Sequence, residues 1–293
     1  MKSSLSWDGA PDLPLALTSL KLDHPDAAVS APSGGQDAED VAVHVAGVSH
    51  RYLSRNGGEV KAVDYVDLVV PKGQFVAIVG ASGCGKTSVL NMMAGLVSPS
   101  TGQVLLNGKP VVGTSRSVGY MFAKDGLLPW RTARANVSFG LEVRGTPREE
   151  RNRRAQALLE KVGLGQFGNA FPSQLSHGMR QRAALARTMA IDPEIFLLDE
   201  PFAALDAQTK VVLQEEFVRI WEESRKTVVL VTHDISEAVA MADRVIVFSP
   251  RPGRIRADIM IDLPRPRDIE GIRYDDKFVK IARRVWLELG HSH

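Results

Sequence analysis

The spacing of hydrophobic residues changes along the chain, and the first part predicts strands. Apolar residues alternate at 41–45 and run together at 75–79, which is typical of half-buried and fully buried strands. Asn-Gly pairs at 56–57 and 107–108 separate strand-like runs and predict hairpin turns. We therefore expect an antiparallel sheet beside a buried strand over 75–79, followed by a helix over 88–96.

The middle of the chain, from about residue 122 to 188, has helical spacing. Residues 146–149 read Thr-Pro-Arg-Glu, which predicts a capping box with proline in the first turn. Arg151, Arg153 and Arg154 then flank an apolar stripe; they favour a solvated helix face over a basic nucleic-acid patch. The stripe consists of Ala155, Leu158, Leu159 and Val162.

From residue 195 strands and helices alternate, which indicates a parallel sheet. A proline-rich stretch follows, and a final helix is expected around Val279, Ala282, Val285 and Trp286. The fold class is therefore α/β, with a parallel-sheet core, an antiparallel β subdomain and a helical insertion subdomain. The predicted strands are 195–198, 227–232 and 244–249, and the predicted helices are 207–225 and 235–242.

A glycine-rich loop carries the first chemical signal. Residues 80–87 read Gly-Ala-Ser-Gly-Cys-Gly-Lys-Thr, the complete G-x-x-x-x-G-K-[ST] phosphate loop. A strand precedes it and a helix follows it, so backbone N–H groups and the helix start would face a phosphate. Lys86 would meet the outer phosphates and Thr87 would ligate Mg²⁺. This context favours a P-loop NTPase that binds a nucleoside triphosphate over a glycine-rich turn that happens to carry a lysine.

Polar residues at two later strand ends supply the chemistry that hydrolysis needs. Asp199 and Glu200 follow the apolar run 195–198, and His233 follows the strand at 227–232. Carboxyl ends of parallel strands share one edge of the sheet, so these side chains should lie beside the phosphate loop. Asp199 would hold Mg²⁺ with Thr87, and Glu200 would polarise the attacking water. The alternatives are an ordinary strand end and a structural histidine.

Composition and charge limit the other classes. With 293 residues and 44 % hydrophobic composition the chain can bury a large core. A formal charge of +2 is too small to argue for nucleic acid or for an anionic membrane as partner. No apolar run approaches a membrane span, no secretory signal is evident, and the first 40 residues predict a mobile tail. The one cysteine, Cys84, excludes an internal disulfide, suits a reducing cytosol and sits in the phosphate loop as a small tolerated residue.

A second anion site is predicted where the helix at 175–190 begins. Ser176 is a good N-cap, and the free N–H groups of a helix start bind anions. One chain rarely needs two such sites for one nucleotide, unless two copies hold it between them. At this point the sequence resembles the ATP-binding cassette family of transport ATPases, over about residues 41–250. The family signature Leu-Ser-Gly-Gly-Gln has its counterpart in Leu175, Ser176, His177, Gly178 and Met179.

The resemblance implies an ATPase that uses ATP and Mg²⁺ in a head-to-tail homodimer. Ser176 and Gly178 of one subunit would cap the γ-phosphate held by the other subunit, and residues 203–206 would form a dimer contact. Glu200 and Lys86 would be catalytic, with His233 as the switch histidine. Tyr52 would stack on adenine, although a core tyrosine is equally compatible with the sequence. The implied ATP-binding residues are Tyr52, Gly80, Ala81, Ser82, Gly83, Cys84, Gly85, Lys86, Thr87 and Ser88, and Thr87 and Asp199 are the implied metal ligands.

Two positions depart from the family pattern. Ala123 stands where the family has a glutamine that contacts Mg²⁺ and relays the nucleotide state to the membrane partner. Alanine does neither, so we expect the relay to run through Lys124 and Asp125 or to be weaker. His177 replaces the first signature glycine; a side chain pointing into solvent is favoured over one that faces the γ-phosphate. A regulatory module without turnover is the alternative that these departures leave open.

Three segments, 127–132, 249–255 and 263–267, look like importer ATPases for nitrate, aliphatic sulfonates and taurine. This resemblance implies a separate membrane permease, an external solute-binding protein and a peripheral place at the cytoplasmic face of the cell membrane, with no nucleic acid. Trp130 is expected to contact the permease, or else to be buried in the helical subdomain. A ribosome- or DNA-associated cassette and a phosphoryl-transfer kinase fit the motifs less well. The predicted domains are a leader (1–40), an ATPase domain (41–270, with its helical subdomain at 122–188) and a C-terminal helical extension (271–293).

Overall fold

The computed structural model describes residues 40–53 and 57–290. Of the predicted leader, residues 1–39 lie outside this part. Asp40 is described, and its carbonyl oxygen accepts a hydrogen bond from the backbone N–H of Lys72, at 2.8 Å. The domain boundaries proposed above remain predictions.

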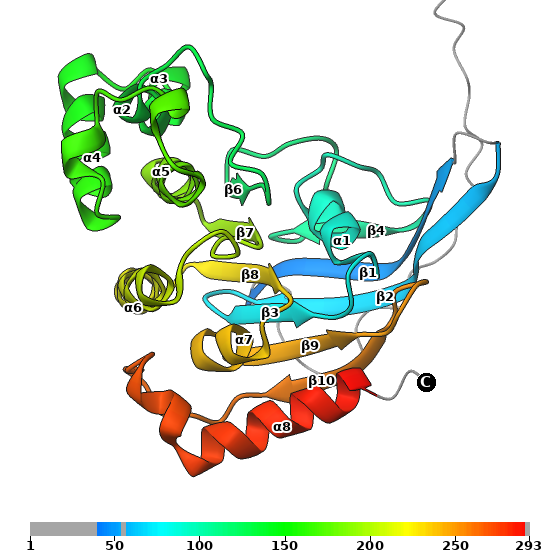
Figure 1. Cartoon of the computed structure of the whole chain (residues 1–293). Helices are drawn as coiled ribbons and strands as arrows, with labels where there is room; N and C mark the ends of the chain where they lie inside the picture. The colour runs from blue at the N-terminus through cyan, green and yellow to red at the C-terminus, as the bar shows by residue number, and fades with distance from the viewer. Residues whose placement is uncertain (1–39, 54–56, 291–293) are drawn as a thin grey trace, which may run out of the picture. The chain divides into compact units, whose positions relative to one another are not determined.

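A six-stranded sheet in the order β10-β9-β3-β8-β7-β6 forms the centre of the fold (Figure 1). The four predicted strands β9, β3, β8 and β7 are parallel, which confirms the parallel core. A fifth parallel strand, β6, was not predicted, and β10 pairs antiparallel with β9 at the edge. Every residue of β3, β7 and β8 is buried, because their runs of valine, isoleucine and leucine are covered on both faces. The strands are β3 (Phe75–Val79), β6 (Val118–Met121), β7 (Ile195–Asp199), β8 (Thr227–Thr232), β9 (Arg244–Phe248) and β10 (Ile255–Met260).

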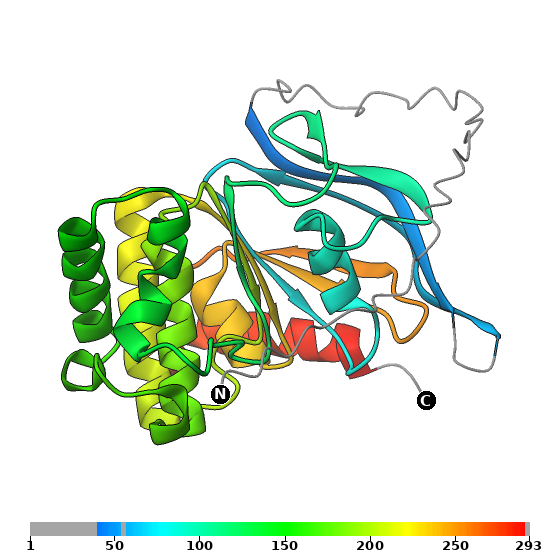
Figure 2. The same cartoon turned by 90° about the horizontal axis from the view of Figure 1, so that it is seen from above.

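A second, antiparallel sheet has the order β2-β1-β4-β5. It packs with helix α1 (Lys86–Met93) against one face of the central sheet, so that α1 lies between the two sheets (Figure 2). Asn107 and Gly108 join β4 to β5 with φ values of 48° and 74°, as a tight hairpin turn requires. The other predicted turn includes Asn56, which lies outside the described residues, but the strands on either side of it, β1 and β2, pair antiparallel. The strands are β1 (Val41–Leu53), β2 (Glu59–Pro71), β4 (Thr101–Leu106) and β5 (Lys109–Pro110).

Helices cover the other face of the central sheet, and a helical region extends beyond it (Figures 1 and 2). Helix α6 (Ala207–Ser224) and helix α7 (Ile235–Met241) agree with the predicted segments to within one residue. The helical region contains α2 (Ala133–Val137), α3 (Phe139–Val143), α4 (Arg148–Lys161) and α5 (His177–Ala190), with short 3₁₀ turns at Gly165–Phe167 and Pro172–Gln174.

Two predictions for this region are wrong in detail. Its first helix begins at Ala133 rather than near residue 122, because the preceding stretch is a loop held by side chains. The capping box at 146–149 does not form. Pro147 is the N-cap of α4 in an extended conformation and no side chain caps the helix. The carbonyl oxygen of Pro147 accepts a hydrogen bond from the N–H of Arg151, at 3.0 Å. The helix therefore begins at Arg148, one residue after the proline that was expected in its first turn.

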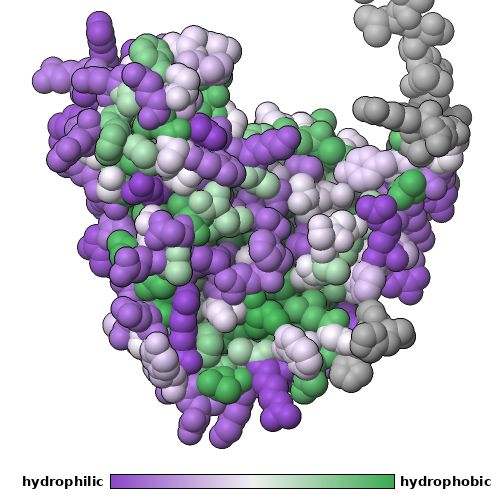
Figure 3. Space-filling model, in the orientation of Figure 1, coloured by the Kyte–Doolittle hydropathy of each residue, from purple (hydrophilic) through white to green (hydrophobic). Residues whose placement is uncertain are grey.

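The arginines of α4 lie on a solvated, charge-paired face. Arg151 lies 3.7 Å from Glu142, and Arg154 pairs with Glu150 one turn earlier. On the face seen in Figure 3, hydrophilic side chains cover most of the helical region, with hydrophobic side chains between them. Ala155, Leu159 and Val162 are buried on the opposite side of α4. These two pairs support the solvated-face interpretation.

The described part of the chain ends in a 3₁₀ turn (Gly271–Tyr274) and helix α8 (Asp276–Gly290), which packs against α7 and β9. Phe278 and Val285 are its buried residues. The expected final helix is confirmed, and Val279 and Trp286 lie on its exposed side. Ile281, Ala282 and Leu289 pack against the core beside Phe278 and Val285.

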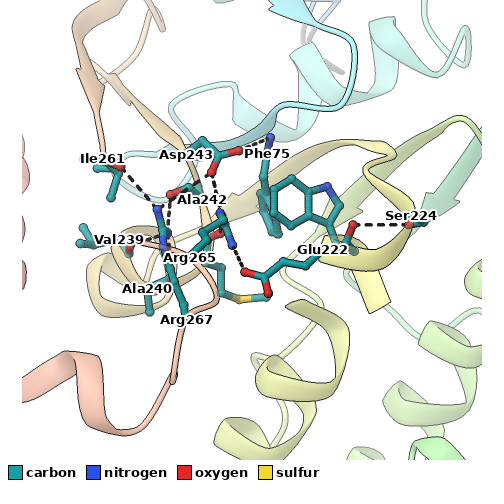
Figure 4. A network of polar contacts seen from close by, with 12 residues as sticks. Phe75, Glu222, Ser224, Val239, Ala240, Ala242, Asp243, Ile261, Arg265 and Arg267 are labelled. Carbon is teal, nitrogen blue, oxygen red and sulfur yellow. Dashed lines mark hydrogen bonds and ion pairs between the residues drawn. The ribbon is translucent and has the colours of Figure 1, made fainter. Parts of the chain in front are cut away.

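A strap of residues 263–267 fastens the end of α7 (Figure 4). The buried Arg267 donates to the backbone oxygens of Val239, Ala240 and Ala242, at 3.3, 3.1 and 2.7 Å. Arg265 donates to Glu222 and to Asp243, at 2.9 Å each. The other oxygen of Asp243 accepts the N–H of Phe75, at 3.1 Å, where the strand that leads to the phosphate loop begins.

Candidate nucleotide-binding and ATPase site

The predicted phosphate loop connects β3 to α1, which begins at Lys86 rather than at residue 88. Gly85 has a φ of 106°, and a Cβ atom there would lie 2.7 Å from the backbone oxygen of Ala62. Only glycine fits this backbone conformation and this close approach. Cys84 is buried, so it does not present an accessible nucleophile.

Lys86 lies inside the loop that precedes it. Its ammonium group donates to the backbone oxygens of Gly80 at 2.8 Å and Ala81 at 3.0 Å. Both partners are neutral carbonyls, so a phosphate in the loop would gain a charge-assisted hydrogen bond from the same ammonium. The loop therefore positions Lys86 for an anion.

Thr87 and Asp199 meet as expected, although 112 positions separate them in the chain. The Thr87 hydroxyl donates to Asp199 Oδ1 at 3.1 Å. Burial raises the pKa of Asp199, while the hydrogen bond from Thr87 and the charge of Lys86 act in the opposite direction. A hydroxyl and a carboxylate are hard oxygen donors of the kind that Mg²⁺ prefers. The pair fits a Mg²⁺ site.

Glu200 and His233 come from the ends of the adjacent strands β7 and β8. His233 Nδ1 lies 3.2 Å from Glu200 Oε1. Glu200 has a φ of 49°, a left-handed conformation that is rare for a residue other than glycine, and its N–H donates to Val231 O at 2.9 Å. Such backbone strain gathers at functional sites. Here it turns the Glu200 side chain toward the phosphate-loop edge.

Tyr52 projects from β1 at the rim of the same site. Its side chain is 40 % exposed, which argues against a core tyrosine. Its hydroxyl donates to Ser88 Oγ at 3.0 Å, and its ring packs edge-on against His50. A cavity of about 200 Å³ brings it together with the phosphate loop. The lining includes Tyr52, Ser82, Lys86, Thr87, Glu200 and Arg251.

The signature segment, residues 175–179, does not line the cavity around the phosphate loop. Ser176 is the N-cap of α5 and accepts the N–H of Met179 at 3.2 Å. His177 is exposed in the single chain. None of these five residues lines the cavity that contains Lys86. Within one chain, the two predicted anion sites therefore do not form a single pocket.

Gln181, which the sequence reasoning missed, connects α5 to the catalytic turn. It is buried, its amide nitrogen donates to Glu200 O at 2.9 Å, and its amide oxygen accepts the N–H of Ala204 at 2.8 Å. A glutamine among the alanines of a buried helix was the available signal. Gln181 fixes the turn after Glu200 relative to the signature helix.

The loop around Ala123 is also tied to α5. Asp125 accepts from Arg180 Nε at 2.9 Å, and Arg180 also donates to the backbone oxygen of Leu175 at 2.8 Å. Arg187 donates to the backbone oxygens of Asp125 and Gly126, at 2.9 and 2.8 Å. The contacts of Asp125 therefore link this loop directly to the signature segment; the relay through the neighbours of Ala123 stays a prediction.

Comparison with known proteins shows the family to which this chain belongs. The profile of the ABC transporter family matches residues 63–203. An ABC transporter ATP-binding protein of Methanocaldococcus jannaschii is 50 % identical over 231 residues, covering 78 % of this chain and 86 % of the relative. The chain therefore belongs to the ABC transporter family, as an ATPase subunit that binds ATP or ADP.

Relatives with a named solute and a solved structure refine the comparison. The taurine import ATP-binding protein TauB of Yersinia pseudotuberculosis is 43 % identical over 231 residues, covering 77 % of this chain and 89 % of TauB. The dimeric ATP-binding cassette MJ0796, in a post-hydrolysis state with ADP and Pi, matches with a TM-score of 0.69 and 32 % identity. That match covers 76 % of this chain and all of the cassette. Among residues 40–53 and 57–290, no helix is long and apolar enough to span a membrane.

Proposed function

We propose that this chain hydrolyses ATP to drive uptake of a small solute of the taurine, sulfonate or nitrate kind through a separate membrane permease. The observation that carries the ATPase site is the convergence of Lys86, the Thr87–Asp199 pair and the Glu200–His233 pair at one sheet edge. The taurine import relatives support the direction of transport and the class of solute.

Glu200 polarises the attacking water in this proposal, and His233 orients that water or the transferring phosphoryl group. Lys86 and the backbone N–H groups of the phosphate loop stabilise negative charge on the phosphates. Mg²⁺, held by Thr87 and Asp199, would supply further charge neutralisation. The strained backbone at Glu200 and the buried carboxylate at Asp199 are consistent with these roles.

Two copies of the chain complete the site. The signature segment is remote from the cavity of its own chain, so a second copy is needed to bring Ser176 to the γ-phosphate. The exposed N-terminus of α5 supplies free N–H groups for that contact. The cassette MJ0796 forms a dimer of its own, which supports the same arrangement here.

The permease contact is proposed on the helical region. Trp130 is 72 % exposed, which excludes the alternative of a tryptophan buried in the helical subdomain. An exposed aromatic side chain between a loop and helices suits a helix of a partner protein. Through this contact the chain would lie at the cytoplasmic face of the cell membrane, in a complex that includes an external solute-binding protein.

One variant tests hydrolysis and pairing together. Glu200→Gln keeps the shape of the side chain but removes the base, so we expect ATPase activity to fall at least about 100-fold while ATP binding persists. With ATP and Mg²⁺ this variant should elute as a dimer, and Glu200→Gln combined with Ser176→Glu should stay monomeric because a carboxylate repels the γ-phosphate.

The exposed Glu223 offers a matched control, since Glu223→Gln should behave as the unmodified chain. Full hydrolysis by Glu200→Gln would refute the catalytic assignment. For the solute, deletion of the gene should abolish growth on taurine or related sulfonates, or on nitrate. Normal growth on all of them would refute the proposed solute class.

A further inference from the structure

The loop at 249–254, between β9 and β10, lies against the phosphate loop. The N–H of Gly253 donates to Ala62 O, and Gly253 O accepts the N–H of Asp64, each at 2.9 Å. A Cβ atom at Gly253 would lie 2.1 Å from the backbone oxygen of Cys84. Arg254 pairs with Asp64 and secures the end of the loop. Strand β2 and the phosphate loop therefore both fix the position of this loop.

Arg251 extends from this loop to the nucleotide cavity. Its Nε donates to the backbone oxygen of Gly83 at 3.2 Å, and its side chain lines the cavity of about 200 Å³ with Lys86 and Thr87. Within residues 40–53 and 57–290 no carboxylate pairs with Arg251, in contrast to Arg254 in the same loop. A cation without a counter-ion thus stands at the rim of a pocket for anions.

We infer that Arg251 is a nucleotide-binding residue that contacts the phosphates of ATP held by the phosphate loop. The inference rests on the proposed phosphate site. A guanidinium offers several N–H donors in a planar fork that matches phosphate oxygens. Because Nε is anchored on Gly83 O, the two terminal nitrogens remain available for the ligand. The fixed backbone of the loop keeps the entropic cost of this contact low.

Equilibrium binding of ATP and of adenosine to the purified chain tests this role. We expect Arg251→Ala to weaken ATP binding about tenfold, the usual scale of a hydrogen bond to a charged group, and to leave adenosine binding unchanged. Arg251→Lys should restore part of the loss, and Arg251→Gln should not, because the charge carries the effect. Arg256→Ala, which removes another partly exposed arginine of the neighbouring strand β10, is the control.

Lys86→Ala separates failure of this inference from failure of the site. If Lys86→Ala loses ATP binding and Arg251→Ala binds as tightly as Arg256→Ala, Arg251 has no role and the site stands. If Lys86→Ala also binds normally, the proposed phosphate site is wrong. An equal loss of ATP and adenosine binding in Arg251→Ala would show that the residue only supports the fold, which overturns the inference.

Discussion

Glu200 shows how much a single residue depends on its neighbours. An Asp-Glu pair after an apolar run is a weak signal alone. The Glu200 side chain nevertheless lies at the edge of the sheet where the sequence predicted it, beside the phosphate loop. Its left-handed backbone and the hydrogen bond from Gln181 to its carbonyl oxygen could not be read from the sequence. The hydrogen bond joins the signature helix to a strand end, between residues 19 apart in the chain.

Ala123 is one of the two positions at which the sequence departs from the expected family pattern. We predict that Ala123→Gln raises basal ATPase activity or lowers the Mg²⁺ concentration required, by about fivefold, because it adds one polar contact at the metal. Steady-state rates over a Mg²⁺ titration measure this. Ala123→Met is the matched control, since it has the same length without the amide. Equal rates for both variants would show that no relay passes through this position.

At the scale of elements, helix α5 carries the signature segment and also holds the loop around Ala123. Arg180 bonds both Asp125 and the backbone oxygen of Leu175. Helical spacing predicted α5 well, because its buried alanines and Leu185 face the core. The hydrogen bonds from Arg180 and Arg187 to the loop around Ala123 were not predicted, because the partners lie about 55 to 62 positions away in the chain.

We predict that the Asp125–Arg180 pair couples these two elements. A double-mutant cycle with Asp125→Asn and Arg180→Gln should give a coupling of about 0.5–1 kcal/mol in the free energy of unfolding, because both side chains are only partly exposed. Amides of residues 122–128 should exchange hydrogen faster in either variant. Arg154→Gln, on the exposed face of α4, should change neither measurement. Independent effects of the two substitutions would contradict the coupling.

For the whole molecule, the C-terminal strap joins parts that the sequence does not connect. Arg267 sits among the carbonyl oxygens of α7, and burial, with the nearby charge of Arg265, lowers its pKa to about 10. Asp243 and Arg265 tie the strap to the start of β3 and to α6. Helix α7, which follows His233, is thereby held by hydrogen bonds to the strap, more than 20 residues later in the chain.

We predict that Arg267→Met lowers the free energy of unfolding by about 3 kcal/mol, because it leaves several buried carbonyl oxygens without donors. Urea denaturation followed by circular dichroism measures this. Arg283→Met on the exposed side of α8 is the control and should change stability by less than about 0.5 kcal/mol. A similar, small effect of both variants would show that the strap is not structural.

Local sequence patterns were sufficient to predict many of the secondary-structure elements and the phosphate loop. Runs of β-branched residues, the Asn-Gly turn at 107–108 and the phosphate loop predicted strands, a hairpin and a triphosphate site, since each depends on residues close together in the chain. The tertiary structure alone decided the contacts between distant segments. In the folded chain Asp125 accepts a hydrogen bond from Arg180 of α5, and Arg267 donates one to the backbone oxygen of Ala242 at the end of α7. Arg251 donates to Gly83, 168 positions away in the sequence. Such contacts depend on how the sheet and helices pack, which the spacing of residues along one segment does not specify.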